Sequence, residues 1–172
     1  MSKNLLYYWD TSIFLAWLKN EKRNPGEMEG LEELATQIHN NEARMITSVV
    51  TKSEILKSTL SNEAVHKLEG VLRRRNVQVI MTDDRIWDLT TELRDYYQQR
   101  KDQDKLPTLT TPDAVHLATA IIYKADTFYT FDEKDERSRR RALIPLSGQV
   151  AGKYNLVISK PMISQLNLHL PS

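Results

Sequence analysis

The chain of 172 residues contains no cysteine, which excludes a disulfide framework, a zinc site built from thiolates and catalysis by a thiol. Glycine is scarce, and the 5 glycines and 6 prolines exclude a low-complexity or collagen-like chain. The sequence also has no Gly-rich phosphate loop, which argues against a nucleoside triphosphatase. These absences leave an ordinary folded domain whose chemistry has to come from other side chains.

An excess of charge and long apolar runs are absent too. The formal net charge is +1, so the total charge neither predicts nor excludes a polyanion as partner. No segment approaches the roughly 20 apolar residues of a membrane span, and the N-terminal segment lacks a signal-peptide cleavage pattern. We therefore expect a single cytoplasmic domain over residues 1–172, with no membrane partner.

Apolar runs and helical spacings alternate along the chain. Runs typical of buried strands occupy residues 5–9, 44–47, 77–81, 128–131 and 157–159. Between them, apolar residues recur at helical spacing, as in Ile13, Phe14 and Trp17. This alternation predicts an α/β fold, an α/β/α sandwich around a central, mainly parallel sheet of short strands.

Three segments stand apart from this alternation. Residues 98–110 are polar and are predicted to form a loop insertion, or lid. Residues 133–142 are highly charged, and we expect a helix there. Residues 145–172 are predicted to form a C-terminal strand and tail.

Four carboxylates, those of Asp10, Glu54, Asp113 and Asp132, each lie where an apolar run ends or a helix begins. Ligands of open parallel sheets bind beyond the carboxyl ends of the strands, so all four fit one edge of the sheet. Each acid alone also has a simpler explanation. Asp10 fits a helix N-cap, Asp113 a complement to a helix dipole, Glu54 a solvated helix residue and Asp132 a turn residue.

Acids gathered at one edge would repel each other, so we expect raised pKa values when no metal is bound. Hard divalent cations prefer oxygen ligands, and a pair of them can activate water and stabilise a leaving oxygen. The cluster therefore predicts a metal-dependent phosphodiester hydrolase.

Short motifs surround these acids in order along the chain. They are Asp10-Thr11-Ser12 after a strand, the segment 48–54 ending in Glu54, the segment 112–120 with Asp113-Ala114-Val115-His116, and Thr130-Phe131-Asp132. Together they resemble the motifs of the PIN-domain family of metal-dependent ribonucleases, over roughly residues 5 to 158. Each motif is short, but all four in the right order are a strong joint signal.

The resemblance implies a site and a reaction. Asp10, Glu54, Asp113 and Asp132 would coordinate one or two Mg²⁺ or Mn²⁺ ions, with Asp135 as an alternative or assistant to Asp132. The hydroxyls of Thr11, Ser12 and Thr130 would support the site. The activity would be endoribonuclease cleavage of RNA by a metal-activated water. Many bacterial relatives are toxins of toxin–antitoxin pairs, so the partners would be RNA, a cognate antitoxin protein and a second copy in a homodimer.

Further side chains have both a functional and a structural explanation. Arg137, Arg139 and Arg140 follow Asp132 closely and are candidate contacts for substrate phosphates, although a solvated charged face explains them as well. His116 lies one helical turn after Asp113, and a structural role is favoured because an oxygen-rich site needs no imidazole.

Two other functions remain compatible with the sequence. One is a non-catalytic PIN-fold module that binds RNA or protein. The other is a metal-dependent nuclease or phosphatase that acts on a different substrate, because an acidic cluster at a sheet edge serves those reactions equally well.

Overall fold

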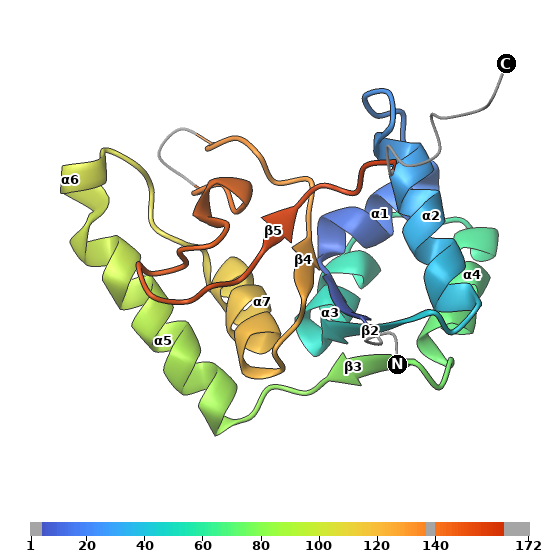
Figure 1. The fold of residues 1–172 in the computed structure, drawn as a ribbon, viewed down its shortest axis with the longest axis horizontal. Coiled ribbons are helices and arrows are strands. Elements are labelled where there is room, and N and C mark those ends of the chain that lie inside the picture. The colour runs from blue at the N-terminus through green and yellow to red at the C-terminus, as the bar shows by residue number, and fades with distance from the viewer. Residues whose placement is uncertain (1–4, 137–139, 164–172) are drawn as a thin grey trace, which may run out of the picture.

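A five-stranded parallel sheet organises the computed structural model, which describes residues 5–136 and 140–163 (Figure 1). The strands lie in the order β3-β2-β1-β4-β5. Their bounds are β1 Leu5–Trp9, β2 Ala43–Ser48, β3 Val77–Ile80, β4 Thr127–Tyr129 and β5 Ile158–Ser159. All four pairings are parallel, and Tyr8 of the central strand pairs with Ile46 on one side and Phe128 on the other. The carboxyl ends of β1, β2 and β4 therefore meet at one edge.

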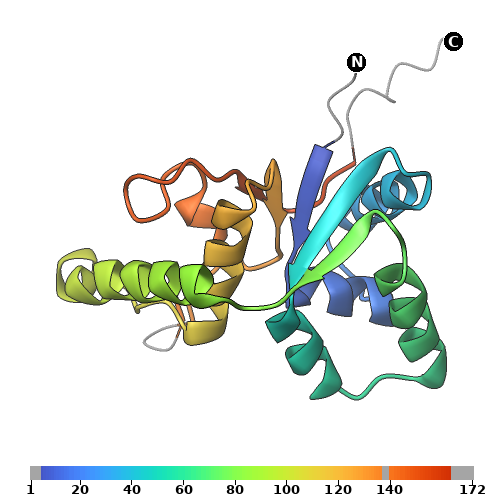
Figure 2. The same ribbon diagram turned by 90° about the horizontal axis from the view of Figure 1, so that it is seen from below.

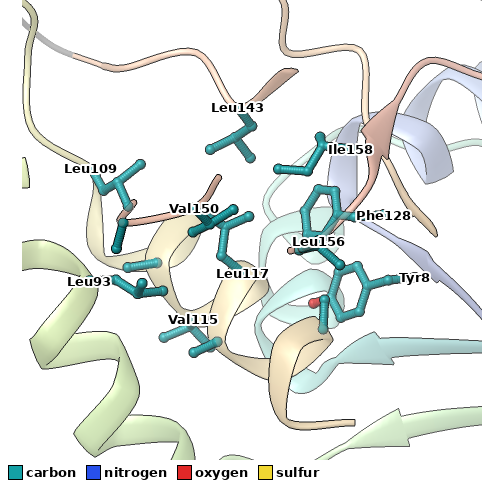
Figure 3. Packing of buried hydrophobic residues seen from close by; sticks show 14 of the residues in the cluster. Tyr8, Leu93, Leu109, Val115, Leu117, Phe128, Leu143, Val150, Leu156 and Ile158 are labelled. Atoms are coloured by element: carbon teal, nitrogen blue, oxygen red, sulfur yellow. The ribbon is translucent and has the colours of Figure 1, made fainter. Parts of the chain in front are cut away.

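The aromatic run of β1 separates two hydrophobic cores. Successive side chains of a strand point to opposite faces of the sheet. Tyr8 accordingly belongs to one core, and Tyr7 and Trp9 belong to the other. All three are buried, which confirms the prediction that 5–9 is an interior strand. Figure 3 shows the first core, in which Tyr8 stacks on Phe128 and both lie near Leu156 and Ile158.

Helices cover both faces of the sheet, and Figures 1 and 2 show them on opposite sides. One side carries α1 Thr11–Lys19, α2 Glu27–His39 and α4 Asn62–Leu72. The other carries α5 Asp84–Gln99 and α7 Thr111–Ile122. The short turn η1 Ile144–Leu146, which comes after β4 in the chain, packs against the same core. The helix α3 Val49–Leu56 follows β2 directly and contacts both α1 and α7. The predicted α/β/α sandwich is confirmed.

Two segments differ from the prediction. The expected helix over residues 133–142 is wrong, because no helix occurs there among the described residues. The chain instead folds back, so that the N–H groups of Leu143 and Ile144 donate to the Asp132 carbonyl at 3.2 and 3.0 Å. The predicted loop over 98–110 is helical in its first half, since α5 extends to Gln99 and α6 spans Lys101–Asp104. Leu143 and Leu109, which follow these two segments, are both buried in the first core, and their contacts there are not local in sequence.

Across the described residues, no helix is long and apolar enough to cross a membrane. The longest, α5, has 16 residues and is polar on its outer side.

Two helical glycines give a matched test of this packing. A Cβ on Gly30 of α2 would lie 2.3 Å from the Met162 carbonyl carbon, whereas a Cβ on Gly70 of α4 would meet nothing within 4 Å. Gly70→Ala should stabilise the protein by about 0.5–1 kcal/mol, because alanine loses less backbone entropy on folding. Gly30→Ala should destabilise it, because the backbone around Met162 has to move away. Urea unfolding measures both changes, and equal effects of the two substitutions would contradict this packing.

Candidate active site

The ends of two neighbouring strands place two of the predicted acids together. Asp10 follows β1 directly, and Asp132 lies three residues after the end of β4. These strands are paired, and the Asp10 N–H donates to the Tyr129 carbonyl at 3.3 Å. Asp113 lies in the first turn of α7, and Glu54 lies near the end of α3. Asp10, Asp113 and Asp132 are all buried.

Asp10 performs a structural task as well. As the N-cap of α1, its Oδ1 accepts hydrogen bonds from the Ile13 N–H at 3.1 Å and from the Ser12 hydroxyl at 2.6 Å. The Ser12 hydroxyl lies 3.3 Å from that of Thr130. Burial raises the pKa of Asp10, and the hydrogen bonds from Ser12 and Thr130 oppose that rise without cancelling it. Capping and membership of the acidic group are therefore compatible at this residue.

Asp113 is held by a residue that the motif search missed. The Thr110 hydroxyl lies 2.5 Å from Asp113 Oδ2, and the same oxygen caps α7 by accepting the Asp113 N–H. The position of Thr110 just before the helix start is the sequence signal that would have identified it. Burial raises the pKa of Asp113, opposed by Thr110 and by the charge of Arg140, and the charge of Asp10 raises it further.

The pKa of Asp132 is raised as well. Burial raises the pKa of Asp132 to about 6, against the hydrogen bond and charge of Arg140, and the charges of Asp113 and Asp10 add to the rise. The Asp132 N–H donates to the Thr130 hydroxyl at 3.0 Å. These mutual effects show that Asp10, Asp113 and Asp132 form one interacting group, which we call the acidic centre.

Glu54 is oriented by a chain of hydrogen bonds. The Ser48 N–H donates to the Tyr8 oxygen, which lies 2.7 Å from His116 Nδ1, and His116 Nε2 lies 3.1 Å from Glu54 Oε2. Burial raises the pKa of Tyr8 well above its ordinary value, so its hydroxyl stays protonated. The hydroxyl therefore donates a hydrogen bond to His116 Nδ1. The Nε2–H group of His116 then donates a hydrogen bond to Glu54, which also accepts one from the Thr11 hydroxyl. His116, for which a structural role was favoured, thus contacts one of the predicted site acids.

The pKa of Glu54 behaves unlike those of the acidic centre. Burial alone would raise it, but hydrogen bonds from His116 and Thr11 outweigh burial and lower the pKa below its ordinary value. The expectation of raised pKa values in the absence of metal is therefore confirmed for Asp10, Asp113 and Asp132 and wrong for Glu54. The sequence alone could not show that His116 would contact this acid.

The other candidate residues lie differently from the expectation. Asp135 is exposed, and its Oδ1 accepts the Ala142 N–H at 2.9 Å. Asp132 is thus the acid that interacts with Asp113. Arg137 and Arg139 lie outside the described residues. The Arg140 guanidinium does not face outward as a free phosphate contact, because its Nη2 lies 2.6 Å from Asp132 Oδ1.

Whether the acidic centre suits a cation depends on its free oxygens. Among the described residues, no group of three or more His, Asp and Glu side chains is arranged as a ready metal site. In the contacts above, protein donors point at one oxygen of each carboxylate. One oxygen is different: Asp132 Oδ2 is buried and has no hydrogen-bond partner. This orphan oxygen and the all-carboxylate donor set fit a hard divalent cation.

Two hollows lie on the surface near these elements. One of about 390 Å³ is lined by Ser12, Phe131, Asp132 and Arg140 among others, so Asp132 is the member of the acidic centre that borders it. Another of about 280 Å³ lies between α2 and α4, is lined by Trp17 among others, and contains no carboxylate. Of these two hollows, the first is therefore the one that borders the acidic centre.

Comparisons with known proteins agree with this architecture. The family described as the PIN domain matches residues 7–140. No curated protein matches the sequence.

Solved structures provide further matches, all at low identity. VapBC2 from Rickettsia felis, bound to a DNA fragment from their promoter, has 17% identity and a TM-score of 0.57, covering 90% of this chain and 98% of that one. DNA-bound VapBC from Salmonella typhimurium has 17% identity and a TM-score of 0.54, covering 80% and 97%. VapBC-1 from nontypeable Haemophilus influenzae has 19% identity and a TM-score of 0.51, covering 74% and 87%. At these identities the likeness concerns the fold alone.

The raised pKa of Asp132 predicts how stability changes with pH in EDTA. The unfolded chain releases this proton near pH 3.8, whereas the folded protein keeps it until a pH of about 6. Between these values the unfolded state binds fewer protons, so stability falls as pH rises. The loss should be about 1–3 kcal/mol. Urea unfolding of the wild type and Asp132→Asn from pH 4 to 7 isolates it. A stability difference between the two that stays constant with pH would contradict the prediction.

Proposed function

The chain belongs to the PIN domain family, and from this premise we propose that it is a Mg²⁺- or Mn²⁺-dependent endoribonuclease. It hydrolyses RNA phosphodiester bonds and leaves a 5′-phosphate and a 3′-hydroxyl. The observation that carries the proposal is the acidic centre itself. Three buried carboxylates interact with one another, and burial raises the pKa of each. Burying these acids together does not stabilise the fold. The arrangement instead suits a site whose negative charge is balanced by a cation.

The residues have distinct roles in this proposal. Asp10, Asp113 and Asp132 hold one or two cations, and Glu54 completes the set from α3. A bound Mg²⁺ or Mn²⁺ supplies Lewis acidity, which lowers the pKa of water and balances the charge that develops on the phosphate. Glu54, kept ionised by Thr11 and His116, orients the attacking water by accepting a hydrogen bond from it.

The supporting hydroxyls fix the acids before the substrate arrives. Ser12 holds Asp10, Thr110 holds Asp113, and Thr130 contacts the Asp132 backbone. Preorganised contacts of this kind avoid the free-energy cost of reorienting groups during the reaction. The hollow lined by Ser12, Phe131 and Asp132 admits the scissile phosphate to the acidic centre.

We also propose that the protein is the toxin of a toxin–antitoxin pair, with a cognate antitoxin as its partner. The sequence resemblance to the PIN-domain toxins supports this role. If it is correct, inducing the wild-type chain in a bacterial expression strain should arrest growth, and Asp113→Asn should not. Growth arrest by both chains, or by neither at equal expression, would contradict the toxin role while leaving the nuclease proposal open.

A second candidate function has one observation in its favour. The described side chains form no ready metal site, which is what a non-catalytic PIN-fold binding module would show. Calorimetric titration with MnCl₂ separates the two candidates. Binding that depends on Asp10 supports the nuclease, and no binding at millimolar Mn²⁺ supports the module.

The nuclease proposal predicts the effect of removing single carboxylates. Asp10→Asn and Asp113→Asn should each slow cleavage by at least roughly 100-fold, because each removes a charged ligand that stabilises the transition state. Cleavage of labelled RNA with Mn²⁺, and with EDTA as a blank, measures the rates. Asp88→Asn on the exposed side of α5 is the matched control and should cleave like the wild type. Unchanged cleavage by either site variant would contradict the proposed mechanism.

A further inference from the structure

Arg140 contributes the only guanidinium that an ion pair places on the acidic centre within residues 5–136 and 140–163. Its Nη2 lies 2.6 Å from Asp132 Oδ1, and the Asp132 side chain is 5% exposed. The charge of Arg140 also acts on Asp113. Glu136 lies at the outer side of the guanidinium, with Oε1 4.0 Å from Nε. The positive group thus lies where the negative charges of two proposed ligands meet.

The ion pair is incomplete on both sides. Arginine commonly binds a carboxylate through two parallel hydrogen bonds, which occupy both oxygens. Here Asp132 Oδ2 and Arg140 Nε are buried and have no hydrogen-bond partner. A buried polar atom without a partner is unfavourable, so this contact is weaker than a two-armed pair. One carboxylate oxygen therefore stays available to a competing cation.

Contacts hold the chain at Arg140 and Arg141, so an exchange needs only the Arg140 side chain to move. The Glu136 N–H donates to the Arg140 carbonyl at 2.9 Å. The next residue, Arg141, is buried, and its guanidinium donates to Asp104 Oδ2 and to the Pro107 carbonyl. Arg140 is half-exposed at 36%, so its side chain has room to turn toward solvent. Arg141 is structural, whereas the close contact of the Arg140 guanidinium is with Asp132, and Glu136 lies farther from it.

We propose that Arg140 is an internal counter-ion of the acidic centre, which pairs with Asp132 in the metal-free protein and which a divalent cation must displace. This inference rests on the proposed metal-dependent function. Metal binding and the Asp132–Arg140 pair are then mutually exclusive, and the internal pair sets how much cation the protein needs. Once displaced, the guanidinium lies at the mouth of the hollow, where a substrate phosphate enters.

Calorimetric titration with MnCl₂ at fixed pH tests the competition. Arg140→Gln removes the positive charge and keeps a polar side chain of similar size. This variant should bind Mn²⁺ roughly tenfold more tightly than the wild type, which corresponds to a gain of about 1.4 kcal/mol in binding free energy. Arg140→Lys keeps the charge and can make a single-armed contact, so it should bind like the wild type. Arg73→Ala on the exposed end of α4 controls for a general loss of positive charge and should also bind like the wild type.

The outcomes separate this inference from the function on which it rests. Equal or weaker Mn²⁺ binding by Arg140→Gln, with binding still abolished by Asp10→Asn, overturns the counter-ion and leaves the metal site intact. No Mn²⁺ binding by any variant overturns the metal dependence and the counter-ion together. Tighter binding by Arg73→Ala to the same extent also overturns the inference, because the effect would then be one of total charge.

A metal-free measurement tests the pair itself. In EDTA, the effects of Arg140→Gln and Asp132→Asn on the urea midpoint should be less than additive in the double variant, because either substitution alone already breaks the contact. Additive effects would overturn the proposal even if every variant folds and binds metal.

Discussion

Burial of three carboxylates at one edge of a parallel sheet is the constraint on which the site depends. Charge is unfavourable in such surroundings, and burial raises the pKa of Asp10, Asp113 and Asp132. The fold creates this situation directly, because paired strands end beside each other and because Asp113 begins a core helix. The hydroxyls of Ser12, Thr110 and Thr130 reduce the penalty, and the penalty persists. A group kept at this expense of stability is typical of a functional site.

The protein stabilises the charged carboxylates of the site by two kinds of contact, one that is part of the fold and one that can be exchanged. Glu54 is held by His116 and Thr11, and the His116 contact continues through Tyr8 into the core, so its orientation is part of the fold. Asp132 is held by a single-armed contact with Arg140, which leaves an oxygen without a partner. We regard the first arrangement as fixed and the second as exchangeable.

The sequence predicted the parts of this structure that depend on local pattern. Strand 5–9 and the capping role of Asp10 follow from short-range chemistry, and the strand order along the chain implied the α/β/α sandwich. The sequence alone did not predict contacts between distant segments. The fold-back after Asp132 depends on burying Leu143, and the lowered pKa of Glu54 depends on His116, 62 residues away. The charge of Arg140 and its closeness to Asp132 in the sequence made it a candidate contact for substrate phosphates. Only the three-dimensional structure shows that it pairs with Asp132.

A crystal structure of the Mn²⁺-soaked protein, with anomalous scattering to locate the ion, would show whether the cation replaces Arg140 at Asp132. We expect an anomalous peak in contact with Asp10, Asp113 and Asp132, with Asp132 Oδ2 among the ligands and the Arg140 side chain turned away. A Mn²⁺-saturated crystal with no peak at the acidic centre, and with the Asp132–Arg140 ion pair unchanged, would contradict it.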